Sequence, residues 1–274
     1  MGVVPWRDKT PCLMGVVNVT PDSFSDGGAF YNPEKAIEHG LRLVEDGADI
    51  LDIGGESTRP HADPVSPQQE MDRVLPMIDG LRDCGCLISI DTRHAGTMQA
   101  ALRAGAGMIN DVTALEGDPE SLAVAAQSSA YVCLMHMQGQ PQTMQDDPHY
   151  DDVIADITAY LRGRIEACRA AGIDQSRLLV DPGIGFGKTL AHNLTILRHL
   201  EAFEALGVPV LLGLSRKSFI EKLCPDTPAS ERLPGSLAGA LWGAQRGVAV
   251  LRVHDVAATR QALTVWRSIQ ETLQ

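Results

Sequence analysis

The sequence of 274 residues predicts an α/β fold, a TIM (β/α)8 barrel in a single domain. Eight short apolar runs alternate with longer stretches of helical periodicity. Most runs are rich in Val, Ile and Leu without alternating polar residues, which is typical of parallel strands buried on both faces. No linker or low-complexity segment divides the chain. A doubly wound open sheet would give the same alternation and is the competing architecture.

The apolar runs are the predicted strands, and they begin after a short N-terminal extension, residues 1–11. The barrel is predicted over residues 12–274. Its strands are predicted at residues 12–19, 50–53, 87–90, 108–110, 131–135, 178–180, 210–214 and 248–253.

The stretches that follow the strands carry helix signals. Asn32 and Pro33 suit a helix start, and Ser66 with Gln69 predicts a capping box. The first helix is expected to bury Ile37, Leu41 and Val44. The second is expected to bury Met71, Val74, Leu75 and Ile78, and the last Leu263, Trp266, Ile269 and Leu273. Glycines that favour a left-handed backbone stand before strands, at Gly47, Gly105, Gly172, Gly207 and Gly247.

Composition excludes several classes of protein. The net charge of -12 argues against a broad nucleic-acid surface. No apolar run is long enough for a transmembrane helix, and residues 1–12 do not read as a signal peptide. Only Cys84 and Cys86 are close in sequence, so the six cysteines predict reduced thiols in a cytoplasmic protein.

A glycine-rich segment, residues 183–189, has the look of a phosphate-binding P-loop. That motif requires glycine five positions before its last glycine, and Pro182 stands there. We therefore interpret these glycines as places where the backbone approaches a ligand closely.

Polar side chains follow every predicted strand. In a barrel these ends meet on one rim, where active sites lie. Helix capping explains about half of them, but it does not explain the cations. The rim cations are Arg59, Lys217, Arg252 and His254.

These side chains divide the predicted site into two ends. The four cations suit a phosphate or diphosphate. Asp91, Asn110 and Asp181 suit a flat, nitrogen-rich heterocycle that carries several N–H donors. Two long loops, residues 20–30 and 57–67, are interpreted as lids, although ordinary connections would also have this length. The rim therefore predicts an enzyme acting on small molecules.

The rim segments together resemble dihydropteroate synthases. The matching stretches occur in the family's order and span most of the chain. They are MGVVNVTPDSFSDGG (14–28), DIGGESTRP (52–60), SIDT (89–92), INDV (109–112), DPGIGFGK (181–188), LSRKSF (214–219) and RVHDV (252–256).

The resemblance implies a TIM barrel and a step of folate synthesis. The amine of p-aminobenzoate would displace diphosphate from 6-hydroxymethyl-7,8-dihydropterin diphosphate, giving dihydropteroate. Mg²⁺ would assist, and a homodimer is implied. An apolar helical face could serve dimerisation, with Leu237, Leu241 and Trp242.

The resemblance also implies roles for individual residues. The pterin-binding positions are Asp91, Asn110, Met135, Asp181, Lys217 and Arg252. The diphosphate-binding positions are Thr58, Arg59, Arg252 and His254. The p-aminobenzoate pocket is implied at Phe24, Pro60, Phe186 and Ser215, and the magnesium ligand is Asn18. Lys217, Arg252, His254 and Asp22 are the implied catalytic residues.

One residue departs from the pattern, because His61 stands where the family often has glycine in the second lid. Two other functions share much of the constellation. One is a pterin-binding methyltransferase that acts with a corrinoid partner, but it would not need the SFSDGG segment or a diphosphate clamp. The other is a paralogue that binds pterin without turnover.

Overall fold

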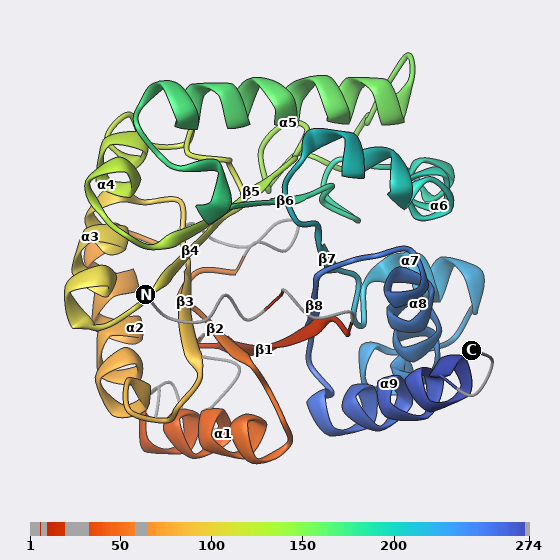
Figure 1. Cartoon of the computed structure of the whole chain (residues 1–274), viewed down its shortest axis with the longest axis horizontal. Coiled ribbons are helices and arrows are strands. Elements are labelled where there is room, and N and C mark those ends of the chain that lie inside the picture. Colours follow the sequence, from red (N-terminus) through yellow and green to blue (C-terminus); the bar gives the residue numbers. More distant parts are fainter. Residues whose placement is uncertain (1–5, 7–9, 20–32, 58–64, 272–274) are drawn as a thin grey trace.

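The fold is a ring of eight parallel strands surrounded by helices (Figure 1). The computed structural model describes Trp6 and residues 10–19, 33–57 and 65–271. The strand order is β6-β5-β4-β3-β2-β1-β8-β7. A parallel bridge from Val180 to Val210 joins the two outer strands, β6 and β7. The predicted TIM barrel is therefore confirmed, and the open sheet is wrong.

The strands begin within a few residues of their predicted positions. They are β1 (Cys12–Asn18), β2 (Ile50–Gly54), β3 (Leu87–Asp91), β4 (Met108–Asp111), β5 (Tyr131–Met135), β6 (Leu178–Asp181), β7 (Leu211–Gly213) and β8 (Val250–Val253). Those with all residues buried include β2, β4, β6 and β7, as expected of parallel strands inside a shell of helices.

Helices follow each strand, and two of them, α7 and α8, lie between β7 and β8. The helices are α1 (Pro33–Glu45), α2 (Pro67–Leu81), α3 (Ala95–Ala104), α4 (Ser121–Gln127), α5 (Val153–Ala170), α6 (Leu190–Arg198), α7 (Ser218–Leu223), α8 (Leu233–Gln245) and α9 (Val256–Glu271).

The predicted helix ends are confirmed where the structure describes them. The side chain of Ser66 accepts a hydrogen bond from the backbone N–H of Gln69, and the predicted capping box is complete. All five glycines predicted before strands have positive φ angles. Asn32 lies outside the described residues.

The predicted buried face of α1 is confirmed in part, since Ile37 and Val44 are half-buried against the core and only Leu41 is exposed. Ala36, Gly40 and Leu43 are buried, whereas Leu41 is 42% exposed. The reason is close packing on α2, since a Cβ at Gly40 would lie 2.7 Å from Cδ1 of Leu81. The small residues therefore face inward, because larger side chains would hold the two helices apart.

The stripes on α2 and α9 are only partly confirmed. On α2, Val74 and Ile78 are buried but Met71 and Leu75 are half-buried. On α9, Leu263 is buried but Ile269 is 57% exposed. A helix of 16 residues is about 24 Å long, whereas a strand of four spans about 13 Å, so α9 extends past β8.

The barrel interior is closed at the amino ends of the strands by Trp6. This side chain is 7% exposed and packs with interior residues such as Met14 and Leu179. Its ring meets that of Tyr131 edge to face, with the centroids 4.6 Å apart. Trp6 belongs to the segment predicted as an extension, so at least one residue of that segment is part of the core.

Replacing Trp6 by alanine is expected to lower the free energy of unfolding by about 3–5 kcal/mol, because the buried ring leaves a cavity. Urea denaturation measures this change. The matched control is Ile269→Ala, whose exposed side chain should change stability by less than about 0.5 kcal/mol. Equal effects of the two changes would show that Trp6 does not close the barrel.

Candidate active site

Strand register brings the predicted polar residues to one level of the rim. Asn18 pairs with Gly54, Gly54 with Asp91, and Asp91 with Asn110. Asp181 ends β6 on the same rim, opposite Met135 of β5. Residues that are far apart in the sequence therefore converge because eight parallel strands end at the same edge.

Arg252 of β8 is the centre of a charged cluster inside this rim. Its Nε donates to Oδ2 of Asp52 at 2.6 Å, and its Nη2 donates to Oδ2 of Asp91 at 2.8 Å. The side-chain amide of Asn110 also donates to Oδ2 of Asp52, at 3.0 Å. One guanidinium thus holds two carboxylates, and we name Asp52, Asp91, Asn110 and Arg252 the arginine cluster.

The two carboxylates of the arginine cluster compete for one cation. Asp52 is fully buried, and its second oxygen has no hydrogen-bond partner among the described residues. Burial and the neighbouring charge of Asp52 raise the pKa of Asp91 to about 7, against the opposing effect of Arg252. The cluster is therefore short of hydrogen-bond donors, and Asp91 is suited to accept N–H groups from a ligand.

Lys217 and Asp181 form the opposite side of the site. The Lys217 ammonium donates to the carbonyl oxygen of Ile184 at 2.5 Å and lies 4.6 Å from the centroid of the Phe186 ring. Burial lowers the pKa of Lys217 to about 8, although Asp181 opposes this shift. Burial also raises the pKa of Asp181, whose Oδ1 accepts from the backbone N–H of Gly183 at 2.7 Å.

Gly213 of β7 lies between these two sides. A Cβ at this position would lie 3.7 Å from Cβ of Arg252 and 3.7 Å from Oδ2 of Asp181. The rim therefore holds three carboxylates, of Asp52, Asp91 and Asp181, and two cations, of Arg252 and Lys217. This arrangement is suited to a polar, partly anionic small molecule that makes several directed hydrogen bonds.

Comparisons with known proteins agree with this geometry. The model of a family described as "Pterin binding enzyme" matches residues 14–254. A dihydropteroate synthase of Haemophilus influenzae is 48% identical over 261 residues, which cover 95% of this chain and 94% of the relative. The chain belongs to the dihydropteroate synthase family. The chain is therefore an enzyme, a transferase of folate synthesis, as the sequence predicted.

Two solved structures of Xanthomonas albilineans dihydropteroate synthase are also similar to this chain. The complex with 4-aminobenzoic acid has a TM-score of 0.90 and 53% identity, covering 95% of this chain and 93% of that chain. The complex with 7,8-dihydropteroate has a TM-score of 0.87 and 50% identity, covering 95% and 94%. The alternative of a corrinoid-dependent methyltransferase finds no support in these relatives.

The segment LSRKSF contains two neighbouring cations, of which Lys217 lies in the site and Arg216 lies outside it. Arg216 is paired with Asp255, with its Nε 2.9 Å from Oδ2. The hydroxyl of Ser215 accepts from the backbone N–H of His254 at 3.2 Å and lies 3.1 Å from Nδ1 of that residue. Ser215 and His254 are therefore neighbours, although the sequence assigned them to different substrates.

Several residues assigned from the dihydropteroate synthase family lie outside the described residues. They are Asp22, Phe24, Thr58, Arg59 and Pro60, together with His61. Among the described ones, Asn18 ends β1 and is half-exposed, and Met135 is buried at the end of β5. Their roles stay predictions.

The sequence interpretation missed Asp52, although it quoted the segment that contains it. Asp52 is a single carboxylate within the run ILDIG, whose five residues are all buried. A buried charge needs a partner, and that is the signal that would have identified it. It also missed Lys188, a fully buried lysine beneath the site.

A second polar network supports the end of β3 from outside. Oε2 of the buried Glu70 accepts from the hydroxyls of Thr92 and Thr97 at 2.8 and 2.7 Å and lies 3.0 Å from Nδ1 of His94. Glu56 is paired with Arg93 through two contacts of 2.9 and 3.0 Å. Oε1 of Glu70 is buried and has no hydrogen-bond partner among the described residues. We assign the network to holding the strand end that carries Asp91, because Thr92 and His94 closely follow that residue.

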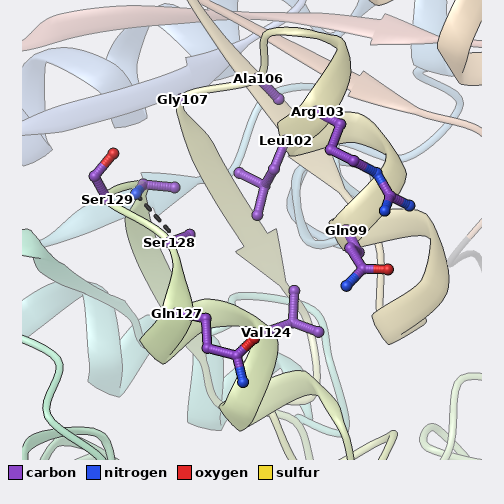
Figure 2. A pocket seen from close by; sticks show the side chains of 10 residues that line it. Gln99, Leu102, Arg103, Ala106, Gly107, Val124, Gln127, Ser128 and Ser129 are labelled. Atoms are coloured by element: carbon purple, nitrogen blue, oxygen red, sulfur yellow. Dashed lines mark hydrogen bonds between the residues drawn. The ribbon is translucent and has the colours of Figure 1, made fainter.

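A separate groove lies at the other end of the barrel. It has a volume of about 500 Å³ and is lined by residues that precede β4 and β5, such as Gly107 and Ser129. Figure 2 shows Gln99 and Arg103 of α3 on one side and Gln127 of α4 on the other. This groove is remote from the rim, because it lies at the amino ends of the strands.

No helix among the described residues has the length and hydropathy to cross a membrane.

Proposed function

We propose that this chain condenses 6-hydroxymethyl-7,8-dihydropterin diphosphate with p-aminobenzoate, giving 7,8-dihydropteroate and diphosphate. The observation that carries the proposal is the arginine cluster facing Lys217 and Asp181 across one rim. The two Xanthomonas albilineans complexes support it, since they hold 4-aminobenzoic acid and 7,8-dihydropteroate.

The pterin would bind through its N–H groups and ring oxygen. Asp91 and Asp181 supply carboxylate acceptors, and the amide of Asn110 is held in place by Asp52. Lys217 supplies a donor from the other side, and Met135 supplies an apolar surface at the end of β5. Because each of these groups is fixed by the barrel, the reacting carbon would be presented in one orientation.

The reaction breaks the bond between the pterin methylene carbon and the diphosphate oxygen. The amine nitrogen of p-aminobenzoate forms the new bond to that carbon and afterwards loses a proton. No side chain of the enzyme needs to act as the nucleophile, because the second substrate brings it. Negative charge develops on diphosphate, and Arg252, His254, Thr58 and Arg59 would stabilise it. Asp22 would lie near the developing positive charge on the pterin.

Asn18 is the proposed protein ligand for Mg²⁺. Its amide side chain stands at the end of β1, half-exposed, and makes no hydrogen bond to another described residue. A free amide oxygen is a ligand that Mg²⁺ accepts, so the residue fits the ion. When bound, Mg²⁺ would neutralise charge on the leaving diphosphate.

The second substrate would lie beside the Phe186 ring, with Phe24, Pro60 and Ser215 completing its pocket. Phe186 is half-exposed and carries the Lys217 ammonium over its face. An aromatic ring at this place suits the ring of p-aminobenzoate.

The chain is proposed to act as a cytoplasmic homodimer. On α8 the side chain of Trp242 is 40% exposed, and the guanidinium of Arg246 lies 3.2 Å from its ring centroid. Leu237 and Leu241 are half-buried on the same helix. This apolar surface would be covered by a second copy.

The test is diphosphate release from the dihydropterin diphosphate in Mg²⁺, with and without p-aminobenzoate. Release should require p-aminobenzoate. Lys217→Ala should lower kcat/KM about 10- to 100-fold, since it removes a charged hydrogen-bond donor. Tight pterin binding without turnover of the wild type would support the non-catalytic paralogue and overturn the proposal.

A further inference from the structure

Lys188 is among the large side chains that are fully buried in the described part of the chain, with 1% of its surface exposed. It follows β6 at the end of the loop formed by residues 182–187, which we name the glycine loop. No carboxylate among the described residues lies within ion-pair distance of its ammonium. An unpaired buried ammonium is costly, so its retention needs a reason other than packing.

Every donor of the Lys188 ammonium has an acceptor. Nζ donates to the carbonyl oxygen of Phe186 at 2.9 Å and to that of His136 at 3.3 Å. Nζ also lies 2.9 Å from Nδ1 of His136, which accepts because an ammonium has only donors. Lys188 thus ties the glycine loop to the segment that follows β5.

The glycine loop is pressed against that segment along its length. Gly183 and Gly187 have φ angles of 70° and 64°. A Cβ at Gly183 would overlap the carbonyl oxygen of His136, and one at Gly187 would overlap that of Gln138. The hydroxyl of Tyr150 donates to the carbonyl oxygen of Gly187 at 2.8 Å. These contacts hold the glycine loop against the segment that follows β5.

The other face of the glycine loop makes contacts within the candidate active site. Ile184 presents its carbonyl oxygen to Lys217, and Phe186 places its ring under the same ammonium. Gly183 donates its N–H to Asp181. Lys188 donates a hydrogen bond to the backbone carbonyl oxygen of Phe186, the residue whose ring lies under the Lys217 ammonium. The buried lysine therefore acts directly on the residue that carries the ring.

We infer that Lys188 is a positioning residue, which sets the Phe186 ring for the second, aromatic substrate through the glycine loop. The inference rests on the proposed function, because it concerns the binding of p-aminobenzoate. Lys188 does not touch that substrate. Its effect is expected on the side of the site that the glycine loop forms and not on the arginine cluster, whose contacts come from other strands.

The pKa values of Lys188 and His136 indicate which of the two holds the proton that they share. Burial lowers the pKa of Lys188 to about 7, opposed by Asp181, with Lys217 adding to the lowering. Burial and the charge of Lys188 lower the pKa of His136 to about 3, so its imidazole is neutral and free to accept. The rings of Tyr150 and Tyr160 pack on His136, at centroid distances of 5.9 and 5.0 Å.

The test is a comparison of Lys188→Met with wild type in steady-state kinetics with both substrates. Methionine fills the same volume but donates no hydrogen bonds. The KM for p-aminobenzoate should rise about tenfold, the equivalent of one lost charged hydrogen bond. The affinity for 6-hydroxymethylpterin, measured by calorimetry, should change by less than about threefold. Lys222→Met on α7 is the control, since that side chain is exposed and outside the site.

A double-mutant cycle separates positioning from general destabilisation. In a Phe186→Leu background, Lys188→Met should change the KM for p-aminobenzoate less than about twofold, because the ring on which it acts is gone. If Lys188→Met does not fold, Tyr150→Phe loosens the same loop from its outer side and should raise this KM about threefold.

Three results would overturn the inference. One is an unchanged KM for p-aminobenzoate in a folded Lys188→Met variant. Another is an equal loss of affinity for both substrates, and the last is an effect as large with leucine at position 186 as with phenylalanine. These results leave the proposed function standing if the wild type turns over. A wild type without turnover would overturn the proposed function and the inference together.

Discussion

Replacing Arg252 by methionine is expected to lower the free energy of unfolding by about 3–5 kcal/mol. Arg252 donates to Asp52 and Asp91, and Asp52 is fully buried. Without the guanidinium, two carboxylates would stay close together in the barrel with no cation between them. Methionine leaves most of the side-chain volume in place, so the loss measures the charge and its hydrogen bonds.

Urea denaturation tests this expectation against a matched variant. Arg216→Met removes the pair with Asp255, in which the two side chains are 34% and 19% exposed. Because that pair is screened by solvent, its loss should cost less than about 1 kcal/mol. If both variants lose the same stability, the arginine cluster is not the buried charge centre described above.

A second substitution identifies the cause of the loss. In the double variant Asp52→Asn with Arg252→Met, one of the stranded carboxylates is also removed. The loss should then be smaller than the sum of the two single losses, by about 0.5–3 kcal/mol. Additive losses would show that Asp52 and Arg252 do not interact through their charges.

The positions of the rim residues could be predicted because the hydrophobic pattern of the sequence marks where each strand ends. An apolar run ends where a polar residue begins, so Asp91, Asn110 and Asp181 could be located without knowing the barrel. The same pattern hides Asp52, which stands within a run and not after one. Its importance comes from a partner, Arg252, that lies 200 positions later in the chain.

Helix faces were harder to predict than strand ends. Hydrophobicity alone placed Ile37, Leu41 and Val44 inward on α1. Ile37 and Val44 do pack against the core, but Leu41 is exposed, and tight contact with α2 fully buries the small residues Ala36 and Gly40. Which small residues allow close approach depends on the neighbouring helix, and a single-chain periodicity does not contain this information.

The segment around Lys188 shows a similar limit. Its glycines were interpreted as places where the backbone approaches a ligand, and that stays a prediction. The structure shows Gly183 and Gly187 close to the backbone carbonyl oxygens of His136 and Gln138. The acceptors that hold the lysine are carbonyl oxygens and a histidine nitrogen from another strand end, His136. Backbone acceptors have no signature in a sequence, so neither the burial of Lys188 nor its contacts could be predicted.

Asp91→Asn is expected to lower kcat/KM for the pterin substrate about 10²- to 10³-fold, because it removes the charged acceptor for an N–H donor in a buried site. The substitution should also change the pH dependence. Burial and Asp52 raise the pKa of Asp91 to about 7, so in the wild type kcat/KM should rise with pH up to about 7. It should fall again near pH 8, where Lys217 loses its proton.

In the asparagine variant the ascending limb near pH 7 should disappear, while the descending limb stays. The measurement is kcat/KM for the dihydropterin diphosphate across this range, at saturating p-aminobenzoate. An ascending limb that persists unchanged in Asp91→Asn would assign it to another group, such as the substrate phosphate or Asp181.

Stability should respond to pH in the opposite direction. A carboxyl group with a raised pKa in the folded state keeps its proton between its ordinary pKa, 3.8, and about 7, where the unfolded chain has released it. The stability of the free enzyme should therefore fall as pH rises through this window.

The contribution of Asp91 can be isolated by comparing wild type with Asp91→Asn. Asp111, whose pKa is raised to about 6, and Asp181, whose pKa is also raised, titrate in both proteins. Urea denaturation at about pH 5 and about pH 8 should show a smaller pH-dependent loss in the variant. The change that weakens use of the pterin substrate would thus remove a charge that the folded, ligand-free barrel holds at a cost. An equal or larger pH-dependent loss in the variant would contradict this account.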